Sequence, residues 1–227
     1  MFCIIAAAGN GNRFGEKKQF LKIGKKYILE LSVEKFISLK IAKIIIAVQK
    51  KDVKIAKKIL AKYKKNVIFV EGKKTRQETV KVAFLSHYKN HSKDDIVLIH
   101  DAARPFFRKK YVTKLIETAK TTKAAILATP IVDTVKYIKN SQIEKTINRK
   151  NLLLSQTPQA FSIEIYKKAI ENAQTENIIC TDDCELVEKI GVKIDFIISS
   201  RSNFKITTKK DLELAKYLMS LEEVQNV

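Results

Sequence analysis

The chain has 227 residues with 44 Lys or Arg against 24 Asp or Glu, so its formal net charge at pH 7 is +20. Its 45% of hydrophobic residues and its few glycines and prolines (6 and 3) are typical of a globular protein and exclude a disordered chain. No apolar run approaches the roughly 20 residues of a membrane-spanning helix, so we expect no membrane association. Because no linker or repeat divides it, we predict a single domain over residues 1–227.

An excess of positive charge is often a sign of a polyanion partner. Here most of it lies on Lys residues of amphipathic stretches such as 50–65, which we interpret as a solvated surface. No aromatic stacking platform or recognition-helix motif accompanies the charge, so we expect no nucleic acid to bind. Three cysteines are too few for a disulfide framework, and the first nine residues lack the features of a signal peptide. Both observations predict a reduced, cytoplasmic protein.

Strand-like and helix-like segments alternate through the first half of the chain. Runs rich in Ile and Val are apolar on both faces, as buried parallel strands are, at residues 2–7, 43–48, 66–70, 95–100 and 124–129. The segments between them have helical periodicity, at residues 27–38, 51–64, 76–87 and 110–120. This order predicts an α/β fold with a Rossmann-like, doubly wound, mostly parallel sheet, whose ligands bind at the carboxyl ends of the strands.

The pattern changes after residue 130. Residues 131–150 alternate with a period of two, which predicts a protruding hairpin with its turn at 139–141. Residues 147–161 carry cations and hydroxyls that we assign to the hairpin or to a loop. Beyond them we expect two helices, a strand and a last helix, at residues 163–173, 182–190, 193–198 and 209–222.

The first predicted strand runs into a glycine-rich loop, AAAGNGNRFG, at residues 6–15. A dinucleotide-binding loop needs a small residue where Phe14 stands, and no Gly-Lys-Ser/Thr closes the stretch as a Walker loop requires. Basic residues follow instead, at Arg13, Lys17 and Lys18. Backbone amides together with cations indicate a site for a nucleoside triphosphate rather than for a redox cofactor.

Each of the other polar motifs can be interpreted as part of a binding site or as part of the structure alone. Asp101, in HDAARPF at the end of the fourth predicted strand, is placed to bind Mg²⁺ near phosphates, or else to cap a helix or pair with Arg104. By themselves, Thr134 could be a cross-strand residue, Thr181 a helix N-cap and Lys205 one more surface lysine. The residues alone leave these alternatives open.

The order of the motifs along the chain favours the functional interpretation of these residues. AAAGNGNRFG, KKQF, TRQETV, HDAARPF, VDTVK, TPQAF, TDD and FKIT occur between residues 2 and about 215. In this order they resemble the cytidylyltransferases that join CTP to 2-C-methyl-D-erythritol 4-phosphate in isoprenoid precursor synthesis. HDAARP and TPQ are the most specific motifs. In the similar pentitol-phosphate cytidylyltransferases the first of these more often reads His-Asp-Ser/Ala-Val-Arg, so the double alanine favours the isoprenoid enzyme.

The resemblance implies roles for residues on the nucleotide side. Those expected to contact CTP are Ala7, Ala8, Gly9, Gly11, Arg76, Thr79, Ala102 and Ala103. The implied catalytic cations are Arg13, Lys18 and Lys205, and Asp101 would hold Mg²⁺ with the triphosphate. A phosphate monoester is itself a nucleophile, so this transfer needs no strong general base, and fixed cations would supply the catalysis.

For the polyol phosphate, the resemblance implies binding by Arg104, Thr134, Arg149, Thr157 and Thr181. The hairpin at about 131–153 would be an arm exchanged between the subunits of a homodimer, so that Thr134 and Arg149 reach the partner's site. The chain departs from the family pattern at Lys73 and Lys74, at Asn148 and at Lys17. The alternatives are a ribitol-5-phosphate cytidylyltransferase, a nucleic-acid-binding protein and a Rossmann oxidoreductase.

Overall fold

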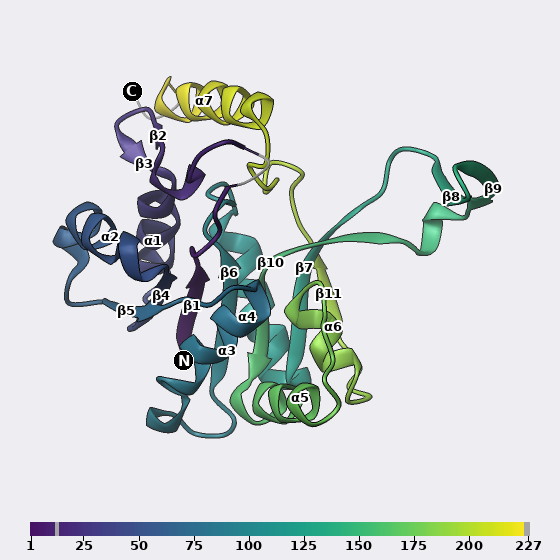
Figure 1. Ribbon diagram of the computed structural model, residues 1–227, viewed down its shortest axis with the longest axis horizontal. Helices are drawn as coiled ribbons and strands as arrows, with labels where there is room; N and C mark the ends of the chain where they lie inside the picture. Colours follow the sequence, from purple (N-terminus) through teal and green to yellow (C-terminus); the bar gives the residue numbers. More distant parts are fainter. Residues whose placement is uncertain (12–13, 225–227) are drawn as a thin grey trace.

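The computed structural model describes residues 1–11 and 14–224, and its centre is a seven-stranded sheet (Figure 1). Its strands are β1 (Phe2–Ala6), β4 (Ile44–Val48), β5 (Val67–Glu71), β6 (Ile96–Asp101), β7 (Ala124–Pro130), β10 (Leu153–Ser162) and β11 (Asp195–Ile198). They lie in the order β11-β7-β10-β6-β1-β4-β5. Four neighbouring pairs are parallel, and β10 runs antiparallel to both β6 and β7. The predicted α/β, mostly parallel sheet is confirmed.

Helices cover both faces of the sheet because alternate strand residues point to opposite sides. The helices are α1 (Ile28–Ser38), α2 (Val53–Ile59), α3 (Arg76–Leu85), α4 (Lys109–Thr122), α5 (Ile163–Thr175), α6 (Asp183–Glu188) and α7 (Lys209–Val224). Cys3 and Ile5 of β1 pack in one core with α1, α2 and α4. Phe2 and Ile4 pack in a second core, with α3, α5 and α6, and α7 packs in a third, smaller one. None of the described helices is long and apolar enough to cross a membrane.

Two local expectations were wrong, and one small element was not expected. Residues 153–162, which we had assigned to a loop or to the hairpin, form β10 in the middle of the sheet. The helix expected at 51–64 is shorter, since α2 is flanked by 3₁₀ turns at Lys50–Asp52 and Ala61–Tyr63. A small hairpin of β2 (Lys22–Ile23) and β3 (Lys26–Tyr27) was not expected at all.

The predicted protruding hairpin is present. Strands β8 (Val135–Lys139) and β9 (Gln142–Ile147) pair with each other in a separate sheet that extends far from the body (Figure 1). Asn140 and Ser141 connect them with φ angles of 49° and 63°. Two consecutive residues with positive φ are typical of the tight turn whose twist matches that of a hairpin. We call residues 131–153 the arm.

Candidate active site

A cavity of about 370 Å³ opens beside the carboxyl ends of β1 and β6, where a doubly wound sheet binds its ligands. The lining includes the glycine-rich loop after β1, the segment between β5 and α3, the turn after β6 and one lysine from the loop before α7. Its described residues are Ala6, Ala7, Ala8, Gly9, Asn10, Gly11, Lys18, Gln19, Lys73, Lys74, Thr75, Arg76, Thr79, Asp101, Ala102, Ala103 and Lys205. All the residues predicted on the nucleotide side lie here except Arg13, which is outside the described residues.

The glycine-rich loop is held in shape by contacts that its motif does not reveal. Gly11 has φ +73°, and a Cβ atom there would lie 1.9 Å from the backbone oxygen of Glu16, so the close approach requires glycine. Buried Gln19 donates hydrogen bonds to the backbone oxygens of Ala7 (2.9 Å) and Gly9 (3.1 Å). Sequence reasoning used KKQF as a motif but gave its glutamine, Gln19, no role, because a glutamine has no charge or spacing that would indicate a buried support.

Lys17 and Lys18 have different environments although they are adjacent. Lys18 lines the cavity, whereas the Lys17 ammonium lies 2.6 Å from the Asp52 carboxylate. Asp52 is buried at the start of α2, so this ion pair fixes the end of the loop against the body. The structure therefore makes Lys18 the cation that faces the cavity and Lys17 a structural residue.

Asp101 is the carboxylate on which the cations of the site converge. Its Oδ1 lies 2.8 Å from Arg76 Nε, and its Oδ2 lies 2.7 Å from Lys205 Nζ and 3.7 Å from Arg104 Nε. Although burial alone would raise the pKa of Asp101, the charges of Arg76 and Lys205 hold it well below its usual range. Asp101 is therefore an anion surrounded by guanidinium and ammonium groups, and the expected pairing with Arg104 is the longest of its three ion pairs.

Asp101 is fixed from behind by the TPQ segment of β10. The hydroxyl of Thr157 accepts a hydrogen bond from the Asp101 amide at 3.0 Å and contacts His100 Nδ1 at 3.1 Å. Burial lowers the pKa of His100 to about 3, so the ring is neutral. With its one proton on Nε2, His100 donates to the Arg104 backbone oxygen and accepts from Thr157. His100 and Thr157 thus shape the turn that carries Asp101.

Gln159 of the same motif holds the start of α6. Its side chain is fully buried, and its Nε2 lies 2.8 Å from Asp182 Oδ2 while its Oε1 accepts from the Cys184 amide at 3.0 Å. Asp182, and not Thr181, is the N-cap of α6, because its side chain accepts from the amide of Glu185. The helix-cap reading of Thr181 was wrong, and this residue is exposed and donates its hydroxyl to Glu185.

The segment before α3 is organised by Thr79. Its buried hydroxyl accepts from the Lys73 amide at 2.9 Å and lies 3.3 Å from the Lys73 backbone oxygen. A Cβ atom on Gly72 would lie 2.4 Å from the Cβ of Ala8, so this segment packs directly on the glycine-rich loop. The ammonium-bearing residues Lys73 and Lys74 both line the cavity at this point.

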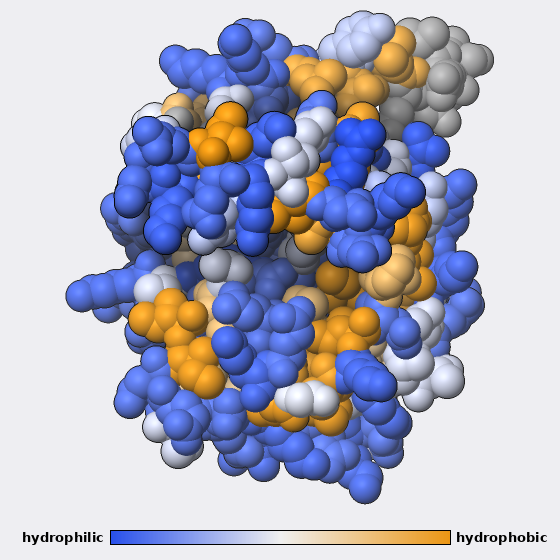
Figure 2. Space-filling model, turned by 90° about the vertical axis from the view of Figure 1, so that its right-hand side faces the viewer, coloured by the Kyte–Doolittle hydropathy of each residue, from blue (hydrophilic) through white to orange (hydrophobic). Residues whose placement is uncertain are grey.

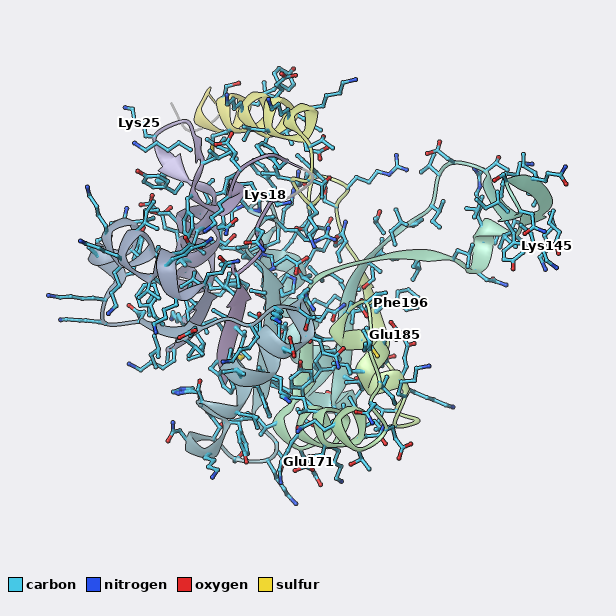
Figure 3. The ribbon with its side chains drawn as sticks, viewed as in Figure 1. Lys18, Lys25, Lys145, Glu171, Glu185 and Phe196 are labelled. Carbon is cyan, nitrogen blue, oxygen red and sulfur yellow. The ribbon has the colours of Figure 1, made fainter. Side chains whose placement is uncertain are left out.

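The residues predicted for the acceptor do not line this cavity. Arg104 and Thr157 contact Asp101 from outside the cavity lining, and Thr181 lies at the start of the α6 segment. Thr134 and Arg149 belong to the arm, where the Arg149 guanidinium donates to the Val132 backbone oxygen. Figure 3 shows Lys18 on the body of the protein and Lys145 at the far end of the arm. Thr134 directly precedes β8 and Arg149 follows β9 by two residues, and both strands lie away from the body in Figure 1, so these residues are separated from their own cavity.

Among the described residues, the lining of the cavity offers a metal ion one carboxylate. In residues 1–11 and 14–224 there is no group of three or more His, Cys, Asp or Glu side chains that could hold an ion. Asp101 is the single carboxylate among the described lining residues. Mg²⁺ commonly takes one or two carboxylates and completes its shell with substrate phosphates and water. Asp101 therefore fits an ion that arrives with a triphosphate.

A doubly wound sheet, a glycine-rich loop after its first strand and a cationic cavity around one carboxylate are the features expected of a nucleotidyltransferase. Residues 1–221 match the family model described as 2-C-methyl-D-erythritol 4-phosphate cytidylyltransferase (IspD). Curated relatives with that name include one from Halalkalibacterium halodurans, 35% identical over 225 residues and 97% of both chains. Another, from Endomicrobium trichonymphae, is 38% identical over 95% of this chain and 97% of its own.

Solved structures agree with this assignment. The enzyme of that name from Thermus thermophilus has a TM-score of 0.79 at 28% identity, over 96% of this chain and 97% of its own. The 4-diphosphocytidyl-2C-methyl-D-erythritol synthase from Anaerococcus prevotii has a TM-score of 0.83 at 31% identity, over 96% and 95%. The chain belongs to the 2-C-methyl-D-erythritol 4-phosphate cytidylyltransferase family. These matches give no support to the pentitol-phosphate, nucleic-acid-binding or oxidoreductase alternatives.

Proposed function

We propose that the protein transfers the cytidylyl group of CTP to 2-C-methyl-D-erythritol 4-phosphate, with release of pyrophosphate. The observation that carries the proposal is the convergence of the glycine-rich loop, Lys18, Lys205 and Asp101 on one cavity, in a chain of this family. The three cysteines are free thiols, which supports a place for the reaction in the reducing cytoplasm.

In this proposal the triphosphate of CTP lies between the glycine-rich loop and Lys205. Backbone amides of the loop and the ammonium groups of Lys18 and Lys205 offer hydrogen bonds and positive charge to phosphate oxygens. Arg13, which lies outside the described residues, is proposed as a further phosphate ligand. Ala7, Ala8, Ala102 and Ala103 are small, so the sugar and base can approach the backbone closely.

We propose a second role for Lys205, in the exchange of partners at Asp101. Its ammonium now pairs with Asp101 Oδ2 at 2.7 Å, and an entering triphosphate presents a competing, more highly charged partner. Movement of Lys205 to the phosphates would remove the nearest cation from Asp101 Oδ2 and let this oxygen hold Mg²⁺, while Arg104 stays at 3.7 Å and Arg76 keeps Oδ1. The ion, when bound, would neutralise phosphate charge and orient the triphosphate.

The chemistry then requires positioning and charge rather than a base. An oxygen of the acceptor's monoester phosphate attacks the α-phosphorus of CTP, and the bond to the β-phosphate oxygen breaks on the opposite side. Negative charge grows on the α-phosphate and on pyrophosphate, towards which Lys18 and Lys205 are directed in this proposal. Deletion of one preorganised donor lowers the rate of other enzymes by about 10² to 10³. His100, the one histidine near the cavity, is buried and neutral, which agrees with catalysis that uses no base.

The acceptor phosphate is proposed to lie between Asp101 and the α6 segment, near Arg104, Thr157 and Thr181. Thr134 and Arg149 would join it from the arm of a second subunit, because their own cavity is out of reach. Large apolar side chains are exposed on the arm, with Ile138 and Ile143 at 65% and 66% exposure. A surface of this kind on a hairpin supports contact with a partner subunit.

The exposed edge strand β11 also supports contact with a second subunit. Strand β11 is the outermost strand on this side, and Phe196 and Ile198 stay exposed on it. Figure 2 shows the side of the molecule from which the arm extends, and apolar patches are scattered over this side. An uncovered apolar edge strand is usually protected in the native assembly. We therefore propose a homodimer with exchanged arms.

The test of the proposed function is a substrate panel followed by pyrophosphate release. Purified protein is given Mg²⁺ with CTP, ATP, GTP or UTP, each with 2-C-methyl-D-erythritol 4-phosphate or ribitol 5-phosphate. The proposal requires release with CTP and the methylerythritol phosphate, and much slower release with every other pair. Equal or faster release with ribitol 5-phosphate would move the protein to the pentitol-phosphate class.

A further inference from the structure

A chain of ion pairs and hydrogen bonds connects the α6 segment with Asp101. Arg76 lies in the middle of it, with its Nε 2.8 Å from Asp101 Oδ1 and its Nη1 2.6 Å from Asp183 Oδ2. Asp183 is fully buried, and its other oxygen accepts a hydrogen bond from the Tyr166 hydroxyl at 2.6 Å. Asp183 is absent from the cavity lining, whereas Arg76 and Asp101 are part of it.

Arg76 contacts the carboxylates of Asp101 and Asp183 through different nitrogen atoms. Nε faces Asp101 and Nη1 faces Asp183, while Nη2 is buried and has no hydrogen-bond partner in the described part of the chain. The planar guanidinium is therefore held at one angle by two anions on different sides. Of the two Asp101 oxygens, Oδ1 is committed to this fixed donor, and Oδ2 is shared by Lys205 and the more distant Arg104.

We infer that Asp183 is a positioning residue for the transfer: it holds Arg76 in an orientation that occupies only Oδ1 of Asp101 and so keeps Oδ2 for the metal–nucleotide complex. The inference rests on the proposed function. Without the Asp183 charge, Arg76, which is 27% exposed, would be a half-buried cation with a single anion nearby, and Nη1 and the unpartnered Nη2 would turn towards Asp101. Both carboxylate oxygens would then be covered.

The inference explains why an acid stands at position 183. Asp182 already caps α6, so the second acid of the TDD motif is not needed for the helix start. Its carboxylate points into the protein instead, to Arg76 at the first turn of α3. The chain of contacts also ties the segment that carries Thr181 to the nucleotide cavity, since Asp183 is two residues further along.

The experiment measures CTP binding by titration calorimetry without acceptor, once with Mg²⁺ and once with EDTA. The readout is the ratio of the two dissociation constants, which reports the contact between Asp101 and the metal–nucleotide complex. In Asp183→Asn we expect this Mg²⁺ advantage to fall by about tenfold, the loss expected for one charge-assisted contact, and the ratio corrects for any change in CTP affinity without metal. Arg76→Lys keeps the charge but cannot bridge both carboxylates, and we expect the same fall.

Tyr166→Phe is the matched control, because it removes a buried hydrogen bond from Asp183 and leaves the ion pair with Arg76. We expect its Mg²⁺ advantage to stay within about twofold of the wild type. If Asp183→Asn does not fold, Arg76→Lys carries the test. An unchanged Mg²⁺ advantage in a folded Asp183→Asn or Arg76→Lys protein, or an equal fall in Tyr166→Phe, would overturn the inference. Absence of CTP binding to the wild type would instead overturn the proposed function.

Discussion

The backbone amide of Asp101 donates a hydrogen bond to the side chain of Thr157, 56 residues later in the chain, over 3.0 Å. This bond joins the end of β6 to the antiparallel strand β10 and fixes the direction of the Asp101 carboxylate. The contact makes Thr157 a support for the candidate active site, whatever it also contributes to acceptor binding.

We predict that Thr157→Val destabilises the fold by about 1–3 kcal/mol, because a buried amide loses its acceptor. Thr157→Ser keeps the hydroxyl and should lose clearly less. Urea unfolding of both variants gives the two free energies of unfolding. Equal stability of the Val variant and the wild type would show that the bond does not support the turn.

Lys18 and Lys17 provide a matched pair of adjacent lysines. We predict that Lys18→Ala lowers kcat by about 10² to 10³ with a smaller rise in KM for CTP, because the cation acts on charge that grows during transfer. Lys17→Ala should lose stability through its ion pair with Asp52 but keep most of its kcat. Steady-state kinetics on both decide the assignment, and an unaltered kcat in Lys18→Ala would refute it.

Gly11 and Gly15 separate the effect of backbone conformation from that of close contact. Both have positive φ, but only at Gly11 would a Cβ atom meet another atom, the Glu16 backbone oxygen at 1.9 Å. Alanine at Gly15 should cost about 1–2 kcal/mol of stability from the left-handed conformation alone. Gly11→Ala should in addition raise KM for CTP several-fold, since the loop must move. The same KM in both variants would contradict a nucleotide-binding role of the loop shape.

The exchanged arm can be tested by complementation. Lys18→Ala removes the cavity cation and Arg149→Ala removes the arm cation, so each pure variant should be nearly inactive. In a randomly reassembled mixture about half of the dimers are mixed. Each of these has one intact cavity facing one intact arm, so we predict about a quarter of wild-type activity. Activity no higher than that of the separate variants, in a mixture shown by native mass spectrometry to contain mixed dimers, would contradict arm exchange.

Much of the fold follows from local patterns. The doubly apolar runs gave β1, β4, β5, β6 and β7, and the period of two with a turn at Asn140 and Ser141 gave the arm hairpin. In each case a short stretch contains its own signal, since burial on two faces, or on one, sets the period of the hydrophobic residues.

Strand β10 could not be found in this way. Its central residues are polar and include Pro158, which argues against a central strand, and Gln156, Thr157 and Gln159 are nonetheless buried. The register shifts between Gln156 and Gln159, so the ladder is interrupted where the proline lies. The partners of these side chains, among them Asp182 for Gln159 and Asn203 for Gln156, are distant in the sequence and come together only in the fold.

In the candidate site, too, some residues could be predicted from local patterns and others could not. The motifs predicted the residues that line the cavity, because each follows a strand at the same end of the sheet. The supports behind them (Gln19, His100, Gln159 and Asp183) act through buried contacts that no spacing reveals.

The account's central claim is that this chain joins CTP to 2-C-methyl-D-erythritol 4-phosphate at the Asp101 cavity. Phosphorus NMR of a reaction containing both substrates and Mg²⁺ tests it most directly. We predict that the wild type converts the acceptor's monoester signal into a diphosphate diester and releases pyrophosphate in equal amount, and that Lys18→Ala forms neither at a comparable rate. Pyrophosphate without the diester, or no change in either substrate, would contradict the claim.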